Sequence, residues 1–155
     1  MTVEQRIVGI DLGTERIGIA VATGEHDRAR PLATLRRAPS VAADVAAIVA
    51  LLGGKMPGEV VLGLPFEASG VEGPQARLTR SWAVEAVALL GLPIQFRDER
   101  LSSHLAEERM GPMKRGRSGG PPTPSQRRAY RARVDREAAA IILQDDLDAR
   151  VHDAP

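Results

Sequence analysis

The sequence contains no cysteine and few aromatic residues, and these absences narrow the functions open to it. Without cysteine the chain has no disulfide, no thiolate nucleophile and no cysteine ligands for zinc. The three histidines, His26, His104 and His152, are scattered and lack the spacing of metal ligands. Aromatic residues make up only 3% of the chain, which argues against a base-stacking platform for single-stranded nucleic acid.

Long apolar segments are also missing. No apolar run approaches the roughly 18 residues of a membrane-spanning helix, and no signal-peptide core follows the polar residues 1–6. We therefore expect a cytoplasmic protein without a membrane partner. With 155 residues, of which 43% are hydrophobic and 26% charged, the chain is suited to a single domain. We place this domain at residues 1–150 and a short tail at 151–155.

Positive charge, by contrast, is concentrated in one segment. The formal net charge is only +1, yet residues 110–133 carry seven cations and no acid. These cations are Lys114, Arg115, Arg117, Arg127, Arg128, Arg131 and Arg133. Residues 111–124 are rich in glycine, proline and serine, which favours a mobile basic loop over a regular element. Such a loop indicates a polyanion such as nucleic acid as the partner; the alternative is a loop that only improves solubility.

The N-terminal part of the chain places a carboxylate between two apolar runs. Residues 7–10 and 17–21 are rich in β-branched side chains and predict two strands joined by a tight hairpin. Asp11 then lies at the end of a core strand, while Gly18 leaves room for another backbone or a phosphate. Arg16 adds cationic donors beside the acid. The alternative is that Asp11 only forms hydrogen bonds within its own turn.

Strand and helix signals alternate along the rest of the chain. We expect strands at 31–36, 59–64 and 93–97, and helices from Ser40 to Leu52, around 78–90, at 102–110 and from Pro124 to about Leu147. The second helix is expected to bury Leu78, Trp82, Ala86, Leu89 and Leu90. An antiparallel three-strand meander followed by parallel crossovers predicts an α/β, ribonuclease H-like fold with a mixed five-stranded sheet flanked by helices.

In such a sheet, carboxylates that leave different strands can meet, because the carboxyl ends of neighbouring strands lie together. Asp11 leaves the first strand, and the adjacent Asp98 and Glu99 leave the last one. Only one of these two can join Asp11, because neighbouring strand residues point to opposite faces. Asp135 is a third candidate, since the small alanines three and four residues later would let its helix approach the sheet. Converging carboxylates repel one another unless a cation neutralises them, and oxygen ligands suit Mg²⁺ or Mn²⁺.

The ordered set of motifs resembles the YqgF/RuvX family of bacterial proteins. The matching segments are Gly9-Ile10-Asp11-Leu12-Gly13, Val61-Leu62-Gly63-Leu64-Pro65, Asp98-Glu99-Arg100-Leu101-Ser102 and Asp135 with Ala138-Ala139. This resemblance covers nearly the whole chain. It implies a ribonuclease H-like nuclease, related in fold to the Holliday-junction resolvases and assigned to maturing the 5′ end of the small-subunit ribosomal RNA precursor.

By position, the resemblance implies that Asp11, Glu99 and Asp135 are the catalytic metal ligands. It also implies that Arg16 and Arg100 hold a phosphate or brace the acids. The chain differs from the family in the loop after Gly-Leu-Pro, where Glu67 and Ser69 replace the usual Asn and Asp. Another acidic group, Asp145, Asp146 and Asp148, is expected to form a solvated helix end.

The sequence therefore predicts a nuclease that hydrolyses phosphodiester bonds with two Mg²⁺ or Mn²⁺ ions. Lys114, Arg115 and Arg117 would bind the flanking phosphates. The alternatives are a resolvase of branched DNA and a nucleic-acid or ribosome-assembly factor that does not cleave. A more remote one is an ATP-binding, actin-like protein, suggested by the Asp-Leu-Gly-Thr hairpin. Both a monomer and a homodimer are compatible with the sequence, and a resolvase would need two active sites.

Overall fold

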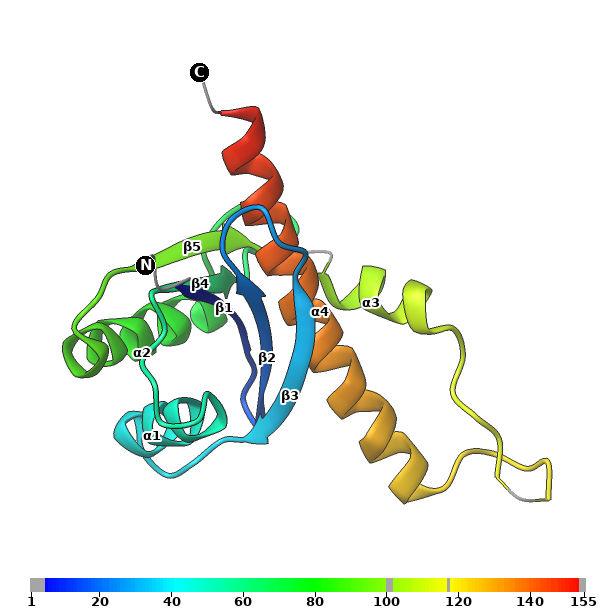
Figure 1. Cartoon of the computed structure of the whole chain (residues 1–155). Helices are drawn as coiled ribbons and strands as arrows, with labels where there is room; N and C mark the ends of the chain where they lie inside the picture. The colour runs from blue at the N-terminus through cyan, green and yellow to red at the C-terminus, as the bar shows by residue number, and fades with distance from the viewer. Residues whose placement is uncertain (1–4, 100–101, 117, 154–155) are drawn as a thin grey trace.

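The computed structural model describes residues 5–99, 102–116 and 118–153. The elements follow the predicted order, with strands and helices alternating after an initial three-strand meander (Figure 1). They are β1 (Arg6–Leu12), β2 (Arg16–Thr23), β3 (Arg30–Arg36), α1 (Val41–Leu51), β4 (Glu59–Leu64), α2 (Pro74–Leu90), β5 (Ile94–Asp98), α3 (Ser102–Met110) and α4 (Pro124–His152).

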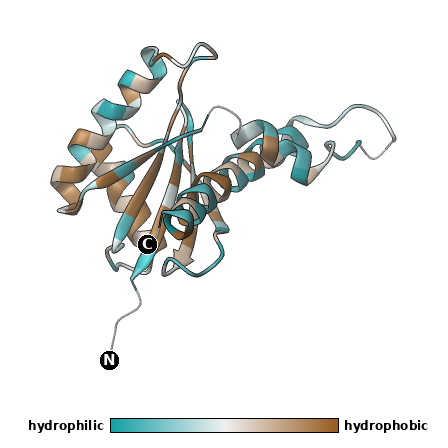
Figure 2. Ribbon diagram, turned by 90° about the horizontal axis from the view of Figure 1, so that it is seen from above, coloured by the Kyte–Doolittle hydropathy of each residue, from teal (hydrophilic) through white to brown (hydrophobic). Residues whose placement is uncertain are grey.

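The five strands form one mixed sheet in the order β3-β2-β1-β4-β5. β1 pairs with β2, and β2 with β3, in antiparallel register, whereas β1–β4 and β4–β5 are parallel. α1 and α2 cover one face of the sheet and α4 crosses the other, with α3 beside α4 (Figure 1). Apolar residues are concentrated along the strands between these helices (Figure 2), and the expected sheet arrangement is confirmed.

Helix boundaries follow local capping signals. The Ser40 side chain accepts a hydrogen bond from the Ala43 N–H at the start of α1, and Thr123 forms a capping box with Gln126 at the start of α4. α4 continues to His152, beyond the end expected near residue 147. Among the described residues, every helix is too short or too polar to cross a membrane.

The buried side of α2 differs from the expected one. Leu78 and Leu89 are 61% and 49% exposed. The residues that α2 buries are Ala76, Thr79, Trp82, Ala83 and Ala86. They lie three or four positions apart, so they form a regular helical stripe made mostly of small side chains. The prediction from large apolar residues was wrong for these two leucines because α2 packs closely through its small residues.

Two glycines allow α4 to lie close to the sheet. A Cβ at Gly9 would come within 2.7 Å of the Leu143 Cβ, and a Cβ at Gly18 would overlap the backbone carbonyl of Asp135. Gly18 is also the residue opposite Asp11 in the β1–β2 ladder. The expected close approach of another backbone at Gly18 is therefore confirmed, and it brings Asp135 beside the strand that carries Asp11.

Candidate active site

Asp11 and Glu99 meet at the carboxyl edge of the parallel strands. Asp11 lies near the end of β1, and Glu99 directly follows β5. β4 runs between these strands, and a Cβ at its Gly63 would lie only 2.5 Å from Glu99 Oε2. Glycine at this position leaves the space through which the Glu99 carboxyl reaches Asp11, and the two carboxyl groups are in hydrogen-bonding contact.

The alternation of side chains along β5 decides which of the two adjacent acids reaches Asp11. Arg97 Nε donates to Asp146 Oδ1 of α4 over 3.0 Å, so Arg97 points to the α4 face of the sheet. Side chains two residues apart in a strand point to the same face, and Glu99 therefore follows Arg97. Asp98 lines a separate pocket of about 580 Å³ at the edge of the sheet, together with residues of α3, α4 and the loop after β4. Glu99 is thus the acid that the structure brings to Asp11.

Burial makes this carboxyl pair retain a proton. The pKa of Glu99 is raised to about 10, first by burial and then by the charge of Asp11 and the hydrogen bond with it. Burial also raises the pKa of Asp11; the hydrogen bond with Glu99 opposes this rise and the negative charge of Asp135 adds to it. Glu99 Oε2 is buried and finds no hydrogen-bond partner among the described residues. At neutral pH the pair therefore holds a proton and leaves one oxygen unsatisfied.

Asp135 lies beside the pair but has a different partner. Arg16 Nε donates to Asp135 Oδ2 over 2.5 Å. The negative charge of Asp135 still raises the pKa of Asp11. Within residues 5–99, 102–116 and 118–153, no three acidic or histidine side chains lie close enough together to hold a metal ion as they stand. The structure thus brings two of the predicted ligands together and places the third next to them, paired with arginine.

The basic segment packs against the N-terminal half of α4. The Tyr130 hydroxyl donates to the Gly111 carbonyl over 2.9 Å, and Gln126 Nε2 donates to the Arg115 carbonyl over 3.0 Å. Lys114 lies in the resulting pocket of about 340 Å³. The Arg115 side chain donates to a carbonyl within the loop itself.

Two of the predicted substrate-binding residues, Arg100 and Arg117, lie outside the described residues. The structure adds Arg136, which lines the same pocket as Lys114 and Arg133 and which sequence analysis missed. Its signal was the spacing of three between Arg133 and Arg136, which places both on one side of a helix.

Residues 5–149 match the family model RuvX, described as Holliday junction resolvase. The chain belongs to the RuvX family. A relative from Anaeromyxobacter sp. (strain Fw109-5) is 42% identical over 145 residues, covering 94% of this chain and 98% of that protein, and is named a pre-16S rRNA nuclease. A relative from Roseiflexus sp. (strain RS-1) with the same name is 38% identical over 145 residues, covering 94% and 95%.

RuvC from T. thermophilus, solved in complex with a Holliday junction substrate, is similar to this RuvX-family chain in structure. The TM-score is 0.52 with 16% sequence identity, and the match covers 97% of this chain and 98% of that one. At this identity the likeness concerns the fold alone. It agrees with the ribonuclease H-like arrangement of the sheet and helices.

One acidic residue of this RuvX-family chain is placed differently from the prediction. Asp146 is only 4% exposed, and it accepts hydrogen bonds from Arg97 Nε at 3.0 Å and Arg150 Nε at 2.9 Å. The expectation that it belongs to a solvated helix end was wrong. Arg97 lies 49 residues away in the sequence, so local pattern alone did not indicate this ion pair.

Proposed function

We propose that this chain is a divalent-metal-dependent nuclease that hydrolyses phosphodiester bonds in processing the 5′ end of the small-subunit ribosomal RNA precursor. The names of the RuvX relatives support the substrate class. The observation that carries the chemistry is the buried Asp11–Glu99 pair, which holds a proton and has an unsatisfied oxygen. Buried groups with strongly shifted pKa values are typical of functional sites.

The residues of this edge fit a hard divalent cation. Asp11 and Glu99 offer oxygen ligands only, and Asp135 lies close enough to add a third carboxylate once it is free of Arg16. A cation would replace the shared proton and satisfy Glu99 Oε2. We therefore assign these three residues as ligands of Mg²⁺ or Mn²⁺. When bound, such ions provide a nucleophile from water and stabilise the charge that develops on the phosphate.

We assign binding of the substrate's phosphate backbone to the basic pocket, which is lined by Lys114 and by Arg133 and Arg136 of α4. Among the described residues, Lys114, Arg133 and Arg136 have no ion pair or hydrogen-bond partner, so their charges are free to meet phosphates. Arg133 and Arg136 stand two residues before and one residue after Asp135, which is within about 3 Å along a helix axis. The pocket and Asp135 thus lie at the same level of α4 but on different sides of the helix, and a strand that contacts both would curve around α4.

The loop residues Arg115 and Arg117 would extend the same phosphate contacts, and Arg100, next to Glu99 in the sequence, would contribute at the acidic site. Contacts of this kind give affinity that falls with salt and depends weakly on base sequence.

A second candidate is cleavage of branched DNA. The description of the matching family model as Holliday junction resolvase favours it. Symmetrical cleavage of two strands requires two active sites, so this function predicts a homodimer, whereas RNA processing can be performed by a monomer.

The deciding experiment offers both substrates to the purified full chain with Mn²⁺: a ribosomal RNA precursor that retains its 5′ leader and a four-way DNA junction. The proposal expects cleavage of the RNA that is lost with EDTA and in Asp11→Asn. Glu107→Gln, which removes an exposed acid from α3, is the matched control and should retain cleavage. Cleavage of the junction alone would support the second candidate. Binding without any cleavage would overturn the nuclease proposal in favour of an assembly factor.

A further inference from the structure

The ion pair between Arg16 and Asp135 joins the start of β2 to α4. Besides its bond to Asp135, Arg16 has its Nη1 at 3.5 Å from the exposed Glu15 carboxylate. The Arg16 side chain is 34% exposed and that of Asp135 is 20% exposed. The pair therefore lies at the rim of the acidic site, where a ligand from solvent can reach the guanidinium.

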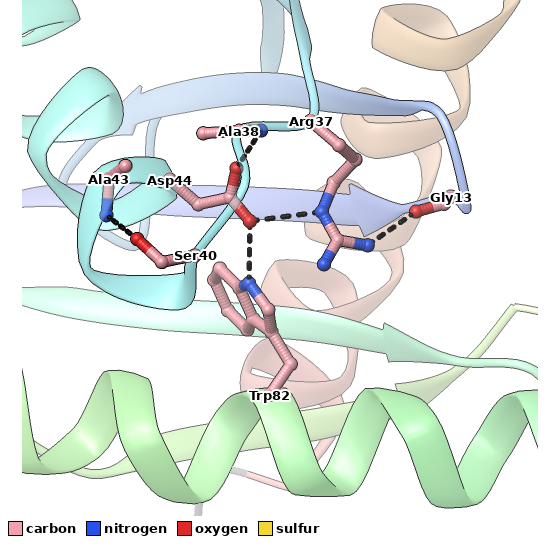
Figure 3. A network of polar contacts seen from close by, with 7 residues as sticks. All are labelled: Gly13, Arg37, Ala38, Ser40, Ala43, Asp44 and Trp82. Carbon is pink, nitrogen blue, oxygen red and sulfur yellow. Dashed lines mark hydrogen bonds and ion pairs between the residues drawn. The ribbon is translucent and has the colours of Figure 1, made fainter.

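The backbone that carries Arg16 is anchored, which leaves its side chain as the part that can change partner. The Gly13 N–H donates to the Arg16 carbonyl over 2.9 Å, and Arg37 Nη1 donates to the Gly13 carbonyl over 2.9 Å. The buried Asp44 binds Arg37 Nε at 2.9 Å and also accepts from Trp82 Nε1 at 3.1 Å (Figure 3). This network fixes the β1–β2 hairpin to α1 and α2.

We infer that Arg16 is a positioning residue that keeps Asp135 from joining Asp11 and Glu99 until a phosphodiester group of the substrate binds its guanidinium. The inference rests on the proposed function. A phosphate bound to Arg16 weakens the attraction of Arg16 for Asp135, because the two anions compete for one cation. The Asp135 carboxylate is then available to a divalent cation beside the buried pair. Because such coupling is reciprocal, the cation in turn strengthens binding of the phosphate.

A fixed brace is the other role open to Arg16. A residue that orients a metal ligand raises metal affinity, and its loss lowers that affinity by roughly 10- to 100-fold. An arginine that competes with the cation for Asp135 has the opposite effect. The arrangement favours competition, since no three acidic side chains of the described residues are gathered to hold an ion while Arg16 contacts Asp135.

The test is to titrate the full chain with Mn²⁺ and to measure binding by calorimetry or from the EPR signal of free Mn²⁺. Without nucleic acid, Arg16→Gln is expected to raise the affinity about tenfold, within the usual range for coupled sites. Arg131→Gln removes the same charge from an exposed residue one turn before Asp135 and should change the affinity far less. A phosphorothioate oligonucleotide, which is charged and resists hydrolysis, should raise the affinity of the wild type more than that of Arg16→Gln.

A double-mutant cycle shows whether the effect passes through the ion pair. In an Asp135→Asn background, Arg16→Gln should no longer change Mn²⁺ affinity. Arg16→Lys, which keeps the charge but lacks the Nε donor, should give a smaller rise, and thermal unfolding verifies that each variant is folded. A Mn²⁺ affinity that is unchanged or lower in Arg16→Gln overturns the inference about Arg16 but does not contradict the proposed metal site. No Mn²⁺ binding in any variant, with or without the oligonucleotide, overturns both the inference and the proposed metal dependence.

Discussion

The two halves of α4 differ in charge, burial and contacts. Residues 124–136 carry five arginines and one acid, and with the basic loop they project away from the sheet (Figure 1). Residues 138–147 include a continuous buried stretch from Ala138 to Leu143 that packs on the sheet and on α3. The candidate ligand Asp135 lies where these halves meet.

This contrast shows how one helix joins substrate binding to the fold. The buried half fixes the position of α4 through close contacts at Gly9 and Gly18. In the exposed half, Arg133 and Arg136 have no ion-pair or hydrogen-bond partner among the described residues, whereas Arg97 and Arg150 beside the buried half are both paired with Asp146. The arginines that hold the buried half in place are thus neutralised by Asp146, whereas the pocket cations of the exposed half remain available to phosphate.

The largest expected effect comes from the acidic pair at the border of the two halves. Asp11→Asn should lower the single-turnover rate of cleavage about 1,000-fold, because loss of a charged ligand removes several kcal/mol of transition-state stabilisation. Its melting temperature should be equal to or higher than that of the wild type, since repulsion between Asp11 and its acidic neighbours is relieved. A rate within a few fold of the wild type, in a preparation free of contaminating nuclease, would remove Asp11 from the mechanism.

The second prediction concerns a substitution that disturbs the close packing between α4 and the sheet. Gly18→Ala places a Cβ against the Asp135 carbonyl, so either α4 or the hairpin must shift. We expect a loss of about 1–3 kcal/mol in the free energy of unfolding, measured by urea denaturation. Gly120→Ala is the matched control, since a Cβ there would approach nothing closer than the Ser118 hydroxyl at 3.7 Å. Equal stability of both variants would show that α4 does not need this contact.

The third prediction concerns pH and the buried pair. The folded chain holds a proton on Glu99 up to a pKa of about 10, whereas the unfolded chain releases it near the ordinary glutamate pKa of 4.5. The folded state therefore binds the extra proton between these values, and the free energy of unfolding should fall as pH rises, by at most about 1.4 kcal/mol per pH unit. Urea unfolding at several pH values should show this slope in the wild type and a flatter one in Glu99→Gln. A steeper slope in the variant would contradict the assignment.

Most elements could be predicted from the sequence because their signals are local. The starts of α1 and α4 are marked by the capping residues Ser40 and Thr123, and β4 is marked by its own apolar run. The buried side of α2 was mistaken at Leu78 and Leu89, because side-chain size was taken as a sign of burial where close packing required small residues.

The candidate site was harder to predict in detail because its contacts join distant segments. Motif order indicated which acids could converge, and strand direction explains why Glu99 rather than Asp98 reaches Asp11. The partner of Asp135 could not be read from local pattern, since Arg16 lies 119 residues away. Which cations stay unpaired is likewise decided only once the chain is folded.

The smallest expected effect, and the one that sharpens the comparison most, concerns the exposed half. Replacing Lys114, Arg133 and Arg136 together with Ala should weaken nucleic-acid binding by a similar factor for different sequences. The slope of log affinity against log salt should flatten by roughly 0.7 to 0.9 per lost phosphate contact. Cleavage at saturating substrate should persist because none of the three is a proposed metal ligand.

The matched control removes Arg127, Arg128 and Arg131, which carry the same total charge on the same half of α4 but do not line the pocket. A general electrostatic attraction would make both triple variants lose affinity and salt dependence equally. A pocket that holds particular phosphates requires the first variant to lose more affinity, because its three cations line the same pocket. If the control loses as much, the exposed half of α4 acts only through its net charge, and the contacts that fix the register of the substrate must come from Arg16 and the residues around the acidic pair.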